Sequence, residues 1–600
     1  MLTSDLIVQR LTEWGVTRVF GYSGDGNNGL MGALQRAGRP EFVQARHEES
    51  AAFMAAGHAK YTGGAGVVTA TQGPGAVHLL TGLYDAKADS VPVVALVGQQ
   101  DRSTLGSGYQ QEVDLHTLFQ DVAAGFAQQL SSPEQVPMAI DRAFRQALAR
   151  RGPAIVIVPQ DVQEATAPDI GQEHGQIPTS PVCGSVDAVP PPEALAEAAR
   201  VLSGRSRLTV LAGQGVAGAW PELAEFAEHT GAAIVTSLLG KPHVDETAPF
   251  VAGTMGHLGT PESAVALQEC DALLIAGSDD PWTEYYPPPG SVPAVQIDLD
   301  PARLGNRHPV AVGIAADAAA SLRALTAALP AAGHDGWRDR IRTAVETGRE
   351  VARQRAEVPT RPGTVNPEAV FSHWRPHADA DDAVLAIDVG SCVYWYVRQL
   401  RTRPGVPAHL SSTLASMGCA VPYGLAAKLA WPHRPVYAFA GDGAVQMLGI
   451  NELITVSRLW RQWEDPRFVL TVLNNGDLAE VSWEQREMEG MPRFAESQDL
   501  PVFDVAAYAT QLGLTGVAVD DPAKLPDAIG AAVTADRPVV LDVRTDPDTP
   551  MLPPLYQDRE KLPGIREALG GEAAPHREHA LRLLEEYAGI ELRLLGLGES

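Results

Sequence analysis

Two short apolar strands, each followed by a polar turn, constrain the fold of this chain more than any other feature. Residues 436–440 predict a buried strand that ends at Gly441-Asp442-Gly443, and residues 468–473 predict another that ends at Asn474-Asn475. The segment between them has the spacing of a helix. In a right-handed β-α-β unit the two turns lie at the same, carboxyl end of neighbouring parallel strands, where the ligands of open α/β sheets bind.

The two turns carry groups that suit a magnesium diphosphate. Glycines let the backbone approach phosphate oxygens, and a helix N-terminus adds partial positive charge. The carboxylate of Asp442 and the amide oxygen of Asn475 are donors that Mg²⁺ prefers. Either turn alone is more often an ordinary tight turn, but the pair predicts a site for Mg²⁺ and diphosphate. We expect the helix to bury one face, which carries Met447, Ile450, Leu453 and Ile454.

Composition argues against several classes of partner. With 600 residues, of which 45% are hydrophobic, the chain has room for three or four domains. Its formal charge of −27 argues against nucleic acid and anionic membranes, which are bound by clustered Lys and Arg. The 4 cysteines form no CxxC pair, which speaks against a disulfide framework or a zinc site. Without a basic, apolar leader or a run of about 18 apolar residues, we expect a cytoplasmic protein.

Strands that alternate with helical segments predict an α/β chain with three doubly wound parallel-sheet domains. We place the first domain at residues 1–165, the central domain at 193–330 and the third domain at 365–548. A linker rich in Pro, Gly and acids covers residues 164–192, and residues 549–600 form a tail. Beyond the two strands described above, strands are predicted at residues 42–45, 67–71, 93–98, 154–159, 208–212, 233–236, 272–276 and 294–298.

The first domain contains an acid and three loops that could complete a cofactor site. Arg46-His47-Glu48-Glu49 follows the strand at residues 42–45, and Glu48 could be a functional acid there. Either glutamate could also simply lie in the first turn of the next helix, where the helix dipole favours an acid. The loops are residues 21–30, 71–75 and 106–112.

Taken in order, these motifs resemble those of thiamine diphosphate-dependent enzymes, with pyruvate oxidases and acetolactate synthases as the nearest group. Gly-Asp-Gly followed by Asn-Asn is the signature of that family, although residues 444–473 make the spacing somewhat longer than the family usually shows. The resemblance covers roughly residues 1–550. It implies that the third domain holds the diphosphate and that the first domain of a different subunit holds the pyrimidine. We therefore expect a homodimer or homotetramer with intersubunit active sites.

The resemblance also implies which residues take part in catalysis. Glu48 matches the glutamate that faces N1′ of the pyrimidine and drives the loss of the proton from C2 of the thiazolium ring. Gln111 lies in a stretch where the family commonly carries Phe-Gln-Glu, and here Gln110 replaces the phenylalanine. Val481 is expected to face the thiazolium ring and to shape the space for the acceptor.

The implied set of cofactor contacts is larger. Met417 could be core filler, but within this order of motifs we interpret it as the side chain that holds thiamine diphosphate in its bent form. The expected ligands of Mg²⁺ are Asp442, Asn475 and the backbone carbonyl of Asp477. Thiamine diphosphate is expected to contact Glu48, Gly73, Pro74, Gly75, Val389, Gly390, Ser391, Ala415, Ser416, Met417, Asp442, Gly443, Ala444, Asn475, Gly476, Asp477 and Leu478.

The central domain has glycine-rich strand ends that, by the same resemblance, would bind FAD. The expected contacts are Met255, Gly256, His257, Leu258, Gly277, Ser278 and Asp298. Alternatively, the glycines merely mark strand ends in a domain that has lost its cofactor. Asp279-Asp280 gives that alternative some weight, because adjacent carboxylates are poor neighbours for a pyrophosphate.

The reaction that the resemblance implies is the decarboxylation of a 2-oxo acid, with pyruvate as the first choice. With FAD nearby, the enamine that remains would be oxidised to acetate, with a quinone or oxygen as the electron acceptor. The alternative is carboligation of two 2-oxo acids, as in acetolactate synthase. A hypothesis of a different class is a non-catalytic cofactor-binding subunit, against which the joint presence of Glu48, Asp442 and Asn475 speaks.

The tail predicts an amphipathic helix at residues 579–597. Helices that dock on membranes usually carry an excess of basic residues on the polar face, whereas this face mixes glutamate with arginine. We therefore expect the helix to pack on its own subunit or on a neighbour, with membrane docking as the less favoured alternative.

Overall fold

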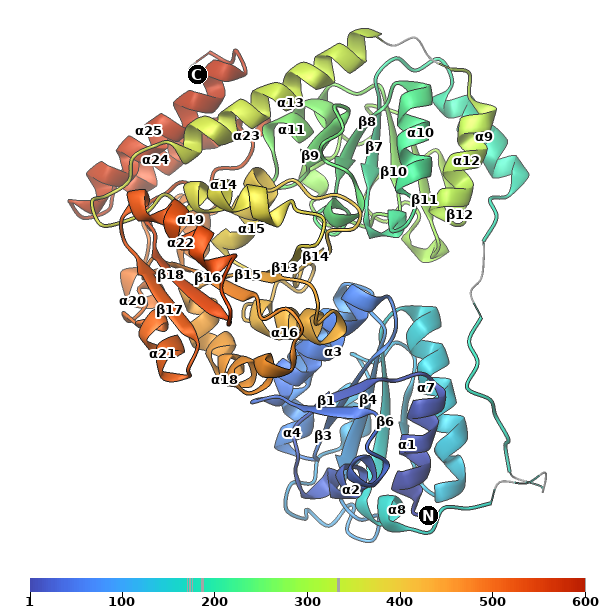
Figure 1. The fold of residues 1–600 in the computed structure, drawn as a ribbon. Helices are drawn as coiled ribbons and strands as arrows, with labels where there is room; N and C mark the ends of the chain where they lie inside the picture. The colour runs from blue at the N-terminus through green and yellow to red at the C-terminus, as the bar shows by residue number, and fades with distance from the viewer. Residues whose placement is uncertain (170, 172–173, 175, 185–187, 332–334, 599–600) are drawn as a thin grey trace.

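The computed structural model describes residues 1–598 except 170, 172–173, 175, 185–187 and 332–334. Within this part of the chain, three six-stranded sheets have every strand parallel to its neighbours, and helices cover both faces of each sheet (Figure 1). These three doubly wound units confirm the predicted fold class. No helix of the described residues is long and apolar enough to span a membrane.

The first sheet lies in the N-terminal, blue part of the chain (Figure 1). In spatial order it consists of β2 (Glu41–Gln44), β1 (Arg18–Gly21), β3 (Gly66–Ala70), β4 (Val93–Gln99), β6 (Pro153–Pro159) and β5 (Ala127–Gln129). Its helices are α1 (Thr3–Glu13), α2 (Asn28–Ala37), α3 (Glu48–Thr62), α4 (Pro74–His78), α5 (Leu80–Ala88), α6 (Leu115–Phe119), α7 (Val136–Arg150) and α8 (Gln160–Glu164). The strand order reverses between β1 and β3, which is where open α/β sheets bind ligands.

The central sheet has the strand order 3-2-1-4-5-6 of dinucleotide-binding folds. Read from the opposite edge, it consists of β12 (Val312–Ala315), β11 (Ala294–Asp298), β10 (Ala272–Ala276), β7 (Leu208–Ala212), β8 (Ala233–Thr236) and β9 (Val251–Thr254). Its helices are α9 (Pro192–Leu202), α10 (Trp220–Thr230), α11 (Pro261–Gln268) and α12 (Ala318–Ala328), and α13 (Asp335–Ala356) leads to the third sheet. Its switch point lies between β7 and β10.

The third sheet repeats the strand order of the first. It consists of β14 (Ala408–His409), β13 (Val384–Ile387), β15 (Val436–Gly441), β16 (Phe468–Asn474), β18 (Val539–Arg544) and β17 (Thr515–Val519). Its helices are α14 (Pro367–Ala378), α15 (Ser391–Gln399), α16 (Ala420–Ala430), α17 (Asp442–Ala444), α18 (Ile450–Leu459), α19 (Ala479–Met488), α20 (Ala495–Gln498), α21 (Val505–Gln511) and α22 (Leu525–Ala532). The tail forms α23 (Leu555–Asp558), α24 (Leu562–Gly570) and α25 (His576–Leu594).

Helix α3 joins the first and third units. It begins at the N-cap His47, whose Nδ1 accepts a hydrogen bond from the Glu49 amide over 3.2 Å, and it ends at Gly63 in the left-handed conformation. Its apolar face packs on α16 in a core that the two units share (Figure 1). The Tyr61 hydroxyl donates a hydrogen bond to the Leu385 carbonyl of β13 over 2.7 Å. The first and third units of one chain are therefore held together by a continuous core.

The helical segment after Gly441-Asp442-Gly443 differs from the prediction. A π-helical turn, residues 445–449, separates α17 from α18, and the wider turn rotates the residues before it relative to those after it. The prediction that Met447 and Ile454 are buried is therefore wrong, since they are 53% and 38% exposed. The side chains that fill the core from this segment are Val445, Leu448, Leu453 and Val456.

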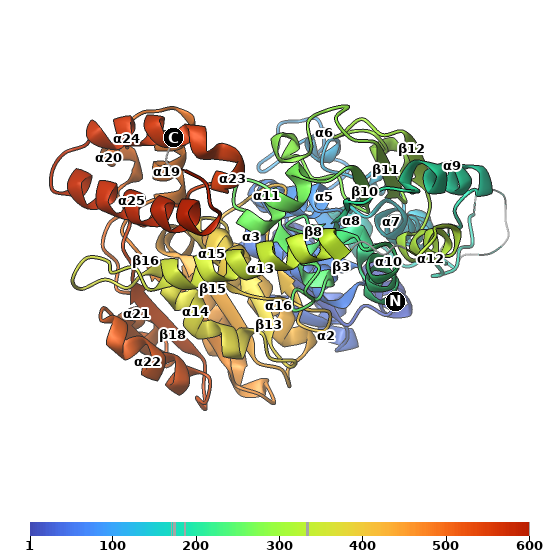
Figure 2. The ribbon, with the colours of Figure 1, turned by 90° about the horizontal axis from the view of Figure 1, so that it is seen from above.

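The tail helix α25 lies beside α13 in two perpendicular views (Figures 1 and 2). It buries an apolar face that includes Leu583, Leu584 and Tyr587. Arg355 of α13 pairs with buried Glu591 over 2.7 Å, which fixes the helix in place. The preference for a helix packed on its own subunit is confirmed.

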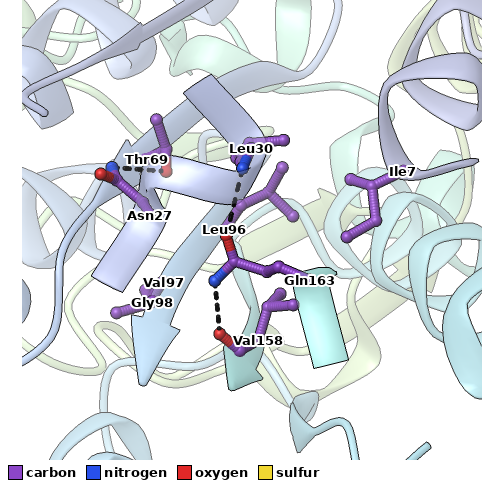
Figure 3. Close-up of a pocket in the computed structure, with 9 residues that line it drawn as sticks. All are labelled: Ile7, Asn27, Leu30, Thr69, Leu96, Val97, Gly98, Val158 and Gln163. Atoms are coloured by element: carbon purple, nitrogen blue, oxygen red, sulfur yellow. Dashed lines mark hydrogen bonds between the residues drawn. The ribbon is translucent and has the colours of Figure 1, made fainter. Parts of the chain in front are cut away.

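A small cavity beneath the first sheet is not a substrate site. Figure 3 shows Gln163, whose amide accepts from the Leu30 N–H over 3.1 Å and donates to the Val158 carbonyl over 2.9 Å. The cavity has a volume of about 10 Å³, about that of one water molecule. Its lining is mostly apolar and belongs to the core of the first unit.

Candidate active site

Asp442 is the centre of the diphosphate half of the site. It begins α17 directly after β15, and 2% of its surface is exposed. Its Oδ2 accepts a hydrogen bond from the Gly476 amide over 2.7 Å, and its Oδ1 accepts one from the Gly443 amide over 3.0 Å. The Gly-Asp-Gly turn and the loop after β16 therefore meet at one carboxylate, as the β-α-β argument predicted.

The carboxylate of Asp442 has the character of a metal ligand. Burial raises the pKa of Asp442 to about 6, and no cationic side chain among the described residues pairs with it. A buried carboxylate without a counter-ion is costly, so a cation at this position would stabilise the protein. The oxygen donors of the turn suit Mg²⁺.

The neighbouring loop supplies the other candidate donors. Asn475 follows β16 and holds the loop by accepting a hydrogen bond from the Asp477 amide over 2.9 Å. The Asp477 carboxylate is already engaged by the Ser482 hydroxyl at 2.9 Å and by Arg493 at 3.3 Å. The side chain of Asp477 therefore has other partners, and the metal contact through its backbone carbonyl stays a prediction. Asn474 is structural, because its amide donates to Asp542 over 2.9 Å.

Asp388, which directly precedes the predicted contacts at residues 389–391, organises two of the predicted contact segments. One carboxylate oxygen accepts from the amides of Val389 and Gly418 over 2.9 and 2.7 Å, and the other accepts from the Ala420 amide over 3.0 Å. It thereby ties residues 389–391, after β13, to residues 415–417, before α16. Its place in the turn after β13 is visible in the sequence, whereas its bonds to Gly418 and Ala420 are not.

Close packing brings Met417 to the diphosphate turn. A methyl group on Gly443 would lie 2.9 Å from Leu478 Cδ2 and 3.3 Å from Met417 Cε, so a side chain fits at this turn only if the ends of those side chains move. Ala444 is buried in α17. Ala415 has φ +55°, a left-handed conformation that costs an alanine roughly 1–2 kcal/mol. Such strain is typical of a segment shaped for a ligand.

Val481 lies in the first turn of α19 and is 46% exposed. The preceding residue, Glu480, has its Oε2 4.0 Å from the position that a methyl group on Gly390 would take. Burial, together with the charge of Glu484, raises the pKa of Glu480 to about 8. The start of α19 therefore lies beside the turn at residues 389–391, with an uncharged carboxyl at neutral pH.

Glu48 belongs to a compact group of residues in the first unit. It begins α3, and its Oε2 lies 3.0 Å from Nδ1 of His78, at the end of α4. A methyl group on Gly75 would lie 3.2 Å from Glu48 Oε1. His78 is a contact that the sequence analysis missed, although it follows the 71–75 turn by only three residues.

Gln111 and the predicted loops meet beside this group. Gln72 donates from Nε2 to Gln111 Oε1 and to Asp25 Oδ1, over 3.0 Å in each case. A methyl group on Gly73 would lie 2.8 Å from Gln111 Cβ, and Pro74 begins α4. The three loops of the first unit are therefore brought together. Gln110 is exposed and donates no side-chain bond within the described residues.

Within one chain, the hydrogen bond that reaches from the segment before Glu48 to the helix after Asp442 does not end at Asp442. The amide of Arg46 donates to Glu452 Oε1 over 2.7 Å, so the end of β2 faces the first turn of α18. Glu452 is ten residues beyond Asp442, which is about 15 Å along a helix. Within the described residues, no hydrogen bond or ion pair joins the two halves of the predicted site.

The predicted flavin loop of the central unit is anchored to the third unit. His257 is buried, with its Nε2 3.2 Å from Glu487 of α19 and its Nδ1 3.3 Å from the Tyr285 hydroxyl. Met255 is buried beside β9, and Leu258 packs against the core of the third unit. Gly256 has φ +102°, which favours glycine.

The switch point of the central sheet is built from close-packed glycines. Gly277 and Ser278 follow β10, and a methyl group on Gly213 would lie 2.2 Å from the Gly277 carbonyl oxygen. Asp298 ends β11, and burial raises its pKa. Asp279 and Asp280 are less unfavourable neighbours for a pyrophosphate than the sequence alone suggests, because Arg307 pairs with Asp279 over 2.9 Å.

The fold and the site define an enzyme of the thiamine diphosphate class. Residues 1–118 match the family described as thiamine pyrophosphate enzyme, N-terminal TPP binding domain. Residues 195–325 match the central domain of that family, and residues 388–543 match its C-terminal TPP binding domain.

Similarity to known proteins extends over nearly the whole chain. YdaP of Bacillus subtilis, whose name proposes that it contains thiamine pyrophosphate, is 35% identical over 91% of this chain and 92% of its own. The large subunit of acetolactate synthase isozyme 2 of Escherichia coli is 30% identical over 93% of this chain and 98% of its own length. Pyruvate oxidase of Lactiplantibacillus plantarum is 28% identical over 92% of this chain and 90% of its own length. The chain therefore belongs to the thiamine pyrophosphate enzyme family, and it is an enzyme of the decarboxylase or carboligase type.

Proposed function

We propose that this enzyme decarboxylates a 2-oxo acid, with pyruvate as the first choice, and oxidises the remaining two-carbon fragment to acetate through FAD. The observation that carries the thiamine diphosphate part of the proposal is the buried carboxylate of Asp442, which has no cationic partner in the described part of the chain. In the assignment that we propose, residues 1–165 bind the pyrimidine, residues 193–330 bind FAD and residues 365–548 bind the diphosphate.

Thiamine diphosphate supplies the electron sink for decarboxylation. Asp442, Asn475 and the Asp477 carbonyl would hold Mg²⁺, and the glycines of the turn would let the backbone approach the diphosphate. Glu48 would hold a proton at N1′ of the pyrimidine, with His78 fixing the orientation of its carboxyl group. Met417 would restrict the shape of the cofactor.

The first and third units that build one site would come from different subunits. Support comes from the hydrogen bond between the Arg46 amide and Glu452, because Glu452 lies in the first turn of α18, ten residues beyond Asp442 of the same chain. A homodimer is then the smallest active form, because each chain completes the site of its partner.

Support for FAD comes from the central sheet. Its strand order is that of dinucleotide-binding folds, and glycines line the switch point between β7 and β10. The ion pair between Arg307 and Asp279 reduces the negative charge there. One relative is named pyruvate oxidase.

A spectrum tests this proposal. Protein purified with its cofactors should be yellow, and pyruvate added without oxygen should bleach the flavin band, because electrons from the substrate reduce the flavin. A colourless protein, or a flavin band that never bleaches, would exclude the oxidase reaction.

Carboligation is the second candidate, because an acetolactate synthase subunit shares 30% identity over 98% of its length. In that case acetolactate should accumulate when pyruvate is the sole substrate, and the flavin band should not bleach. Detection of acetolactate without acetate would replace the first proposal with this one.

A further inference from the structure

A cavity of about 430 Å³ lies where the three units of the chain meet. The end of α3 contributes Lys60 and Tyr61, the start of α10 contributes Trp220, and residues 404–409 close it from the third unit. His243, in the short helix that follows β8, completes the central wall. Pockets of 300–1,000 Å³ hold small molecules. None of its lining residues is among those expected to contact FAD or thiamine diphosphate.

The cavity offers no free charge to an ionic ligand. Lys60 is the one charged side chain of its lining, and Nζ is bonded to Asp89 Oδ2 and to the Leu410 carbonyl, over 2.7 Å in each case. Burial lowers the pKa of His243 to about 4, so its imidazole is neutral at physiological pH. Burial also lowers the pKa of His409. An anion bound here would lose its hydration without gaining a counter-ion.

Flat surfaces and unused hydrogen-bonding groups shape the rest of the cavity. The rings of Tyr61 and His409 contact each other with centroids 4.8 Å apart, and Trp220 stacks on Phe250 at 6.4 Å. In the described part of the chain, no hydrogen bond uses the His243 imidazole or the Trp220 indole N–H. Aromatic and proline surfaces favour planar rings, and the two free polar groups would pair with a ligand that has donor and acceptor atoms at its edge.

We propose that this cavity binds a compact, uncharged nitrogen heterocycle, which stacks on the aromatic wall and forms a hydrogen bond with His243. The cavity is connected to both halves of the predicted thiamine site through one helix and one loop. Helix α3 runs from Glu48 to the cavity, and Asp89, the partner of Lys60, accepts from the amides of Ser412 and Thr413, which lead to residues 415–417.

Calorimetric titration of the full-length protein, saturated with thiamine diphosphate, Mg²⁺ and FAD, tests the proposal. Nicotinamide and adenosine serve as uncharged probes, and nicotinate and adenosine 5′-monophosphate serve as their anionic matches. We expect at least one uncharged probe to bind about tenfold more tightly than its anionic match, since the cavity has no counter-ion to offer.

Variants locate the binding. His243→Leu should weaken binding of that probe about tenfold, because the ligand loses its hydrogen-bond partner, and Trp220→Phe should weaken it less. The matched control is His433→Leu, an exposed histidine outside the cavity, which should leave binding unchanged. If neither uncharged probe binds, if the anions bind equally well, or if His243→Leu and Trp220→Phe both bind as the wild type does, the proposal is wrong. These results do not depend on the reaction that the enzyme catalyses.

Discussion

The first and third units have the same sheet and different chemistry. Both have the strand order 2-1-3-4-6-5 in their own numbering, and both place functional groups at the carboxyl ends of corresponding strands. The end of β3 and the end of β15 correspond, as do the ends of β2 and β14. In the first unit these ends hold an acid, Glu48, close to His78. In the third unit they hold a buried carboxylate, Asp442, and the strained segment at residues 415–417.

The difference shows that the scaffold fixes where groups meet, and that a few residues at the strand ends decide what they do. Glu48 has the imidazole of His78 as its partner at 3.0 Å, as suits a group that exchanges a proton. Asp442 has backbone amides as its only partners among the described residues, as suits a metal ligand. Mutations in the first unit should therefore reduce turnover, whereas mutations in the third unit should reduce cofactor binding.

The largest expected effect is on turnover. Glu48→Gln should reduce kcat by about 10²–10⁴-fold, the contribution of a general acid or base, while the affinity for thiamine diphosphate changes little. Steady-state kinetics and calorimetry would measure the two quantities. Glu49→Gln is the matched control and should be nearly as active as the wild type. Near-normal turnover in Glu48→Gln would show that another acid serves the pyrimidine.

The corresponding change in the third unit should act on binding. Asp442→Asn should weaken Mg²⁺ and thiamine diphosphate by about 100-fold or more, because a direct ligand contributes at least as much as the groups that support it. Asp477→Asn is the control, because it removes a side chain bound to Ser482 and Arg493 and keeps the backbone carbonyl. Equal losses of Mg²⁺ affinity in both variants would contradict the assignment of ligands.

Cofactor binding should depend on pH through Asp442. Since its pKa in the metal-free protein is about 6, protons compete with Mg²⁺ below that value, and the affinity should fall about tenfold per pH unit. Above pH 6 this dependence should level off. The same titration in Asp442→Asn should show no such slope, and a slope that persists there would assign it to another group.

The raised pKa of Asp442 also predicts how the stability of the cofactor-free protein changes with pH. The folded pKa of Asp442 lies above the unfolded value of about 3.9, so the native state binds more protons between those values. The free energy of unfolding therefore falls as pH rises from about 4 to 6. Without cofactors, the free energy of unfolding of Asp442→Asn should lack this fall between pH 4 and 6, which amounts to up to about 2–3 kcal/mol in the wild type. The amide nitrogen that the substitution introduces would face a backbone N–H, so the two proteins are compared by the pH dependence of unfolding and not by Tm at one pH. An equal fall in the variant would contradict this.

The smallest effects should come from the matched glycines. Gly75→Ala would press on Thr71 Cγ2 and on Glu48 Oε1 and should reduce kcat, whereas Gly443→Ala would press on Leu478 and Met417 and should reduce cofactor affinity. The opposing atoms near Gly443 are the ends of flexible side chains, so we expect changes of about tenfold or less there. If both variants lost only cofactor affinity and kept their kcat, the proposed division of roles between the two units would be contradicted.

Much of the fold could be predicted, because parallel strands buried on both faces are short runs of apolar residues. β7, β8, β10 and β11 have the predicted bounds. Other strands escaped prediction: β14 has only 2 residues and gives almost no signal, whereas β13 and β18 are apolar and were nonetheless not predicted. The shared strand order of the first and third units could not be read from the sequence, since it is set by packing and not by similar residues.

The candidate site shows the same limits. Asp442 and Asn475 were found because a turn after a buried strand has a recognisable sequence. The exposure of Met447 was missed, because a π-helical turn depends on packing that no helical spacing reveals. His78 acts through a contact across the chain, and no motif marks such a contact. Asp388 belongs to a recognisable turn, but its bonds to Gly418 and Ala420 could not be predicted from that turn.

The central claim is that Glu48 of one subunit works with Asp442 of another. Mixing Glu48→Gln with Asp442→Asn, followed by dissociation and reassociation, tests it most directly. In a mixed dimer one site would carry both changes and the other would carry neither, so about a quarter of wild-type activity should return at a 1:1 ratio. If each chain builds its own site, every site carries one change, and the mixture would stay inactive.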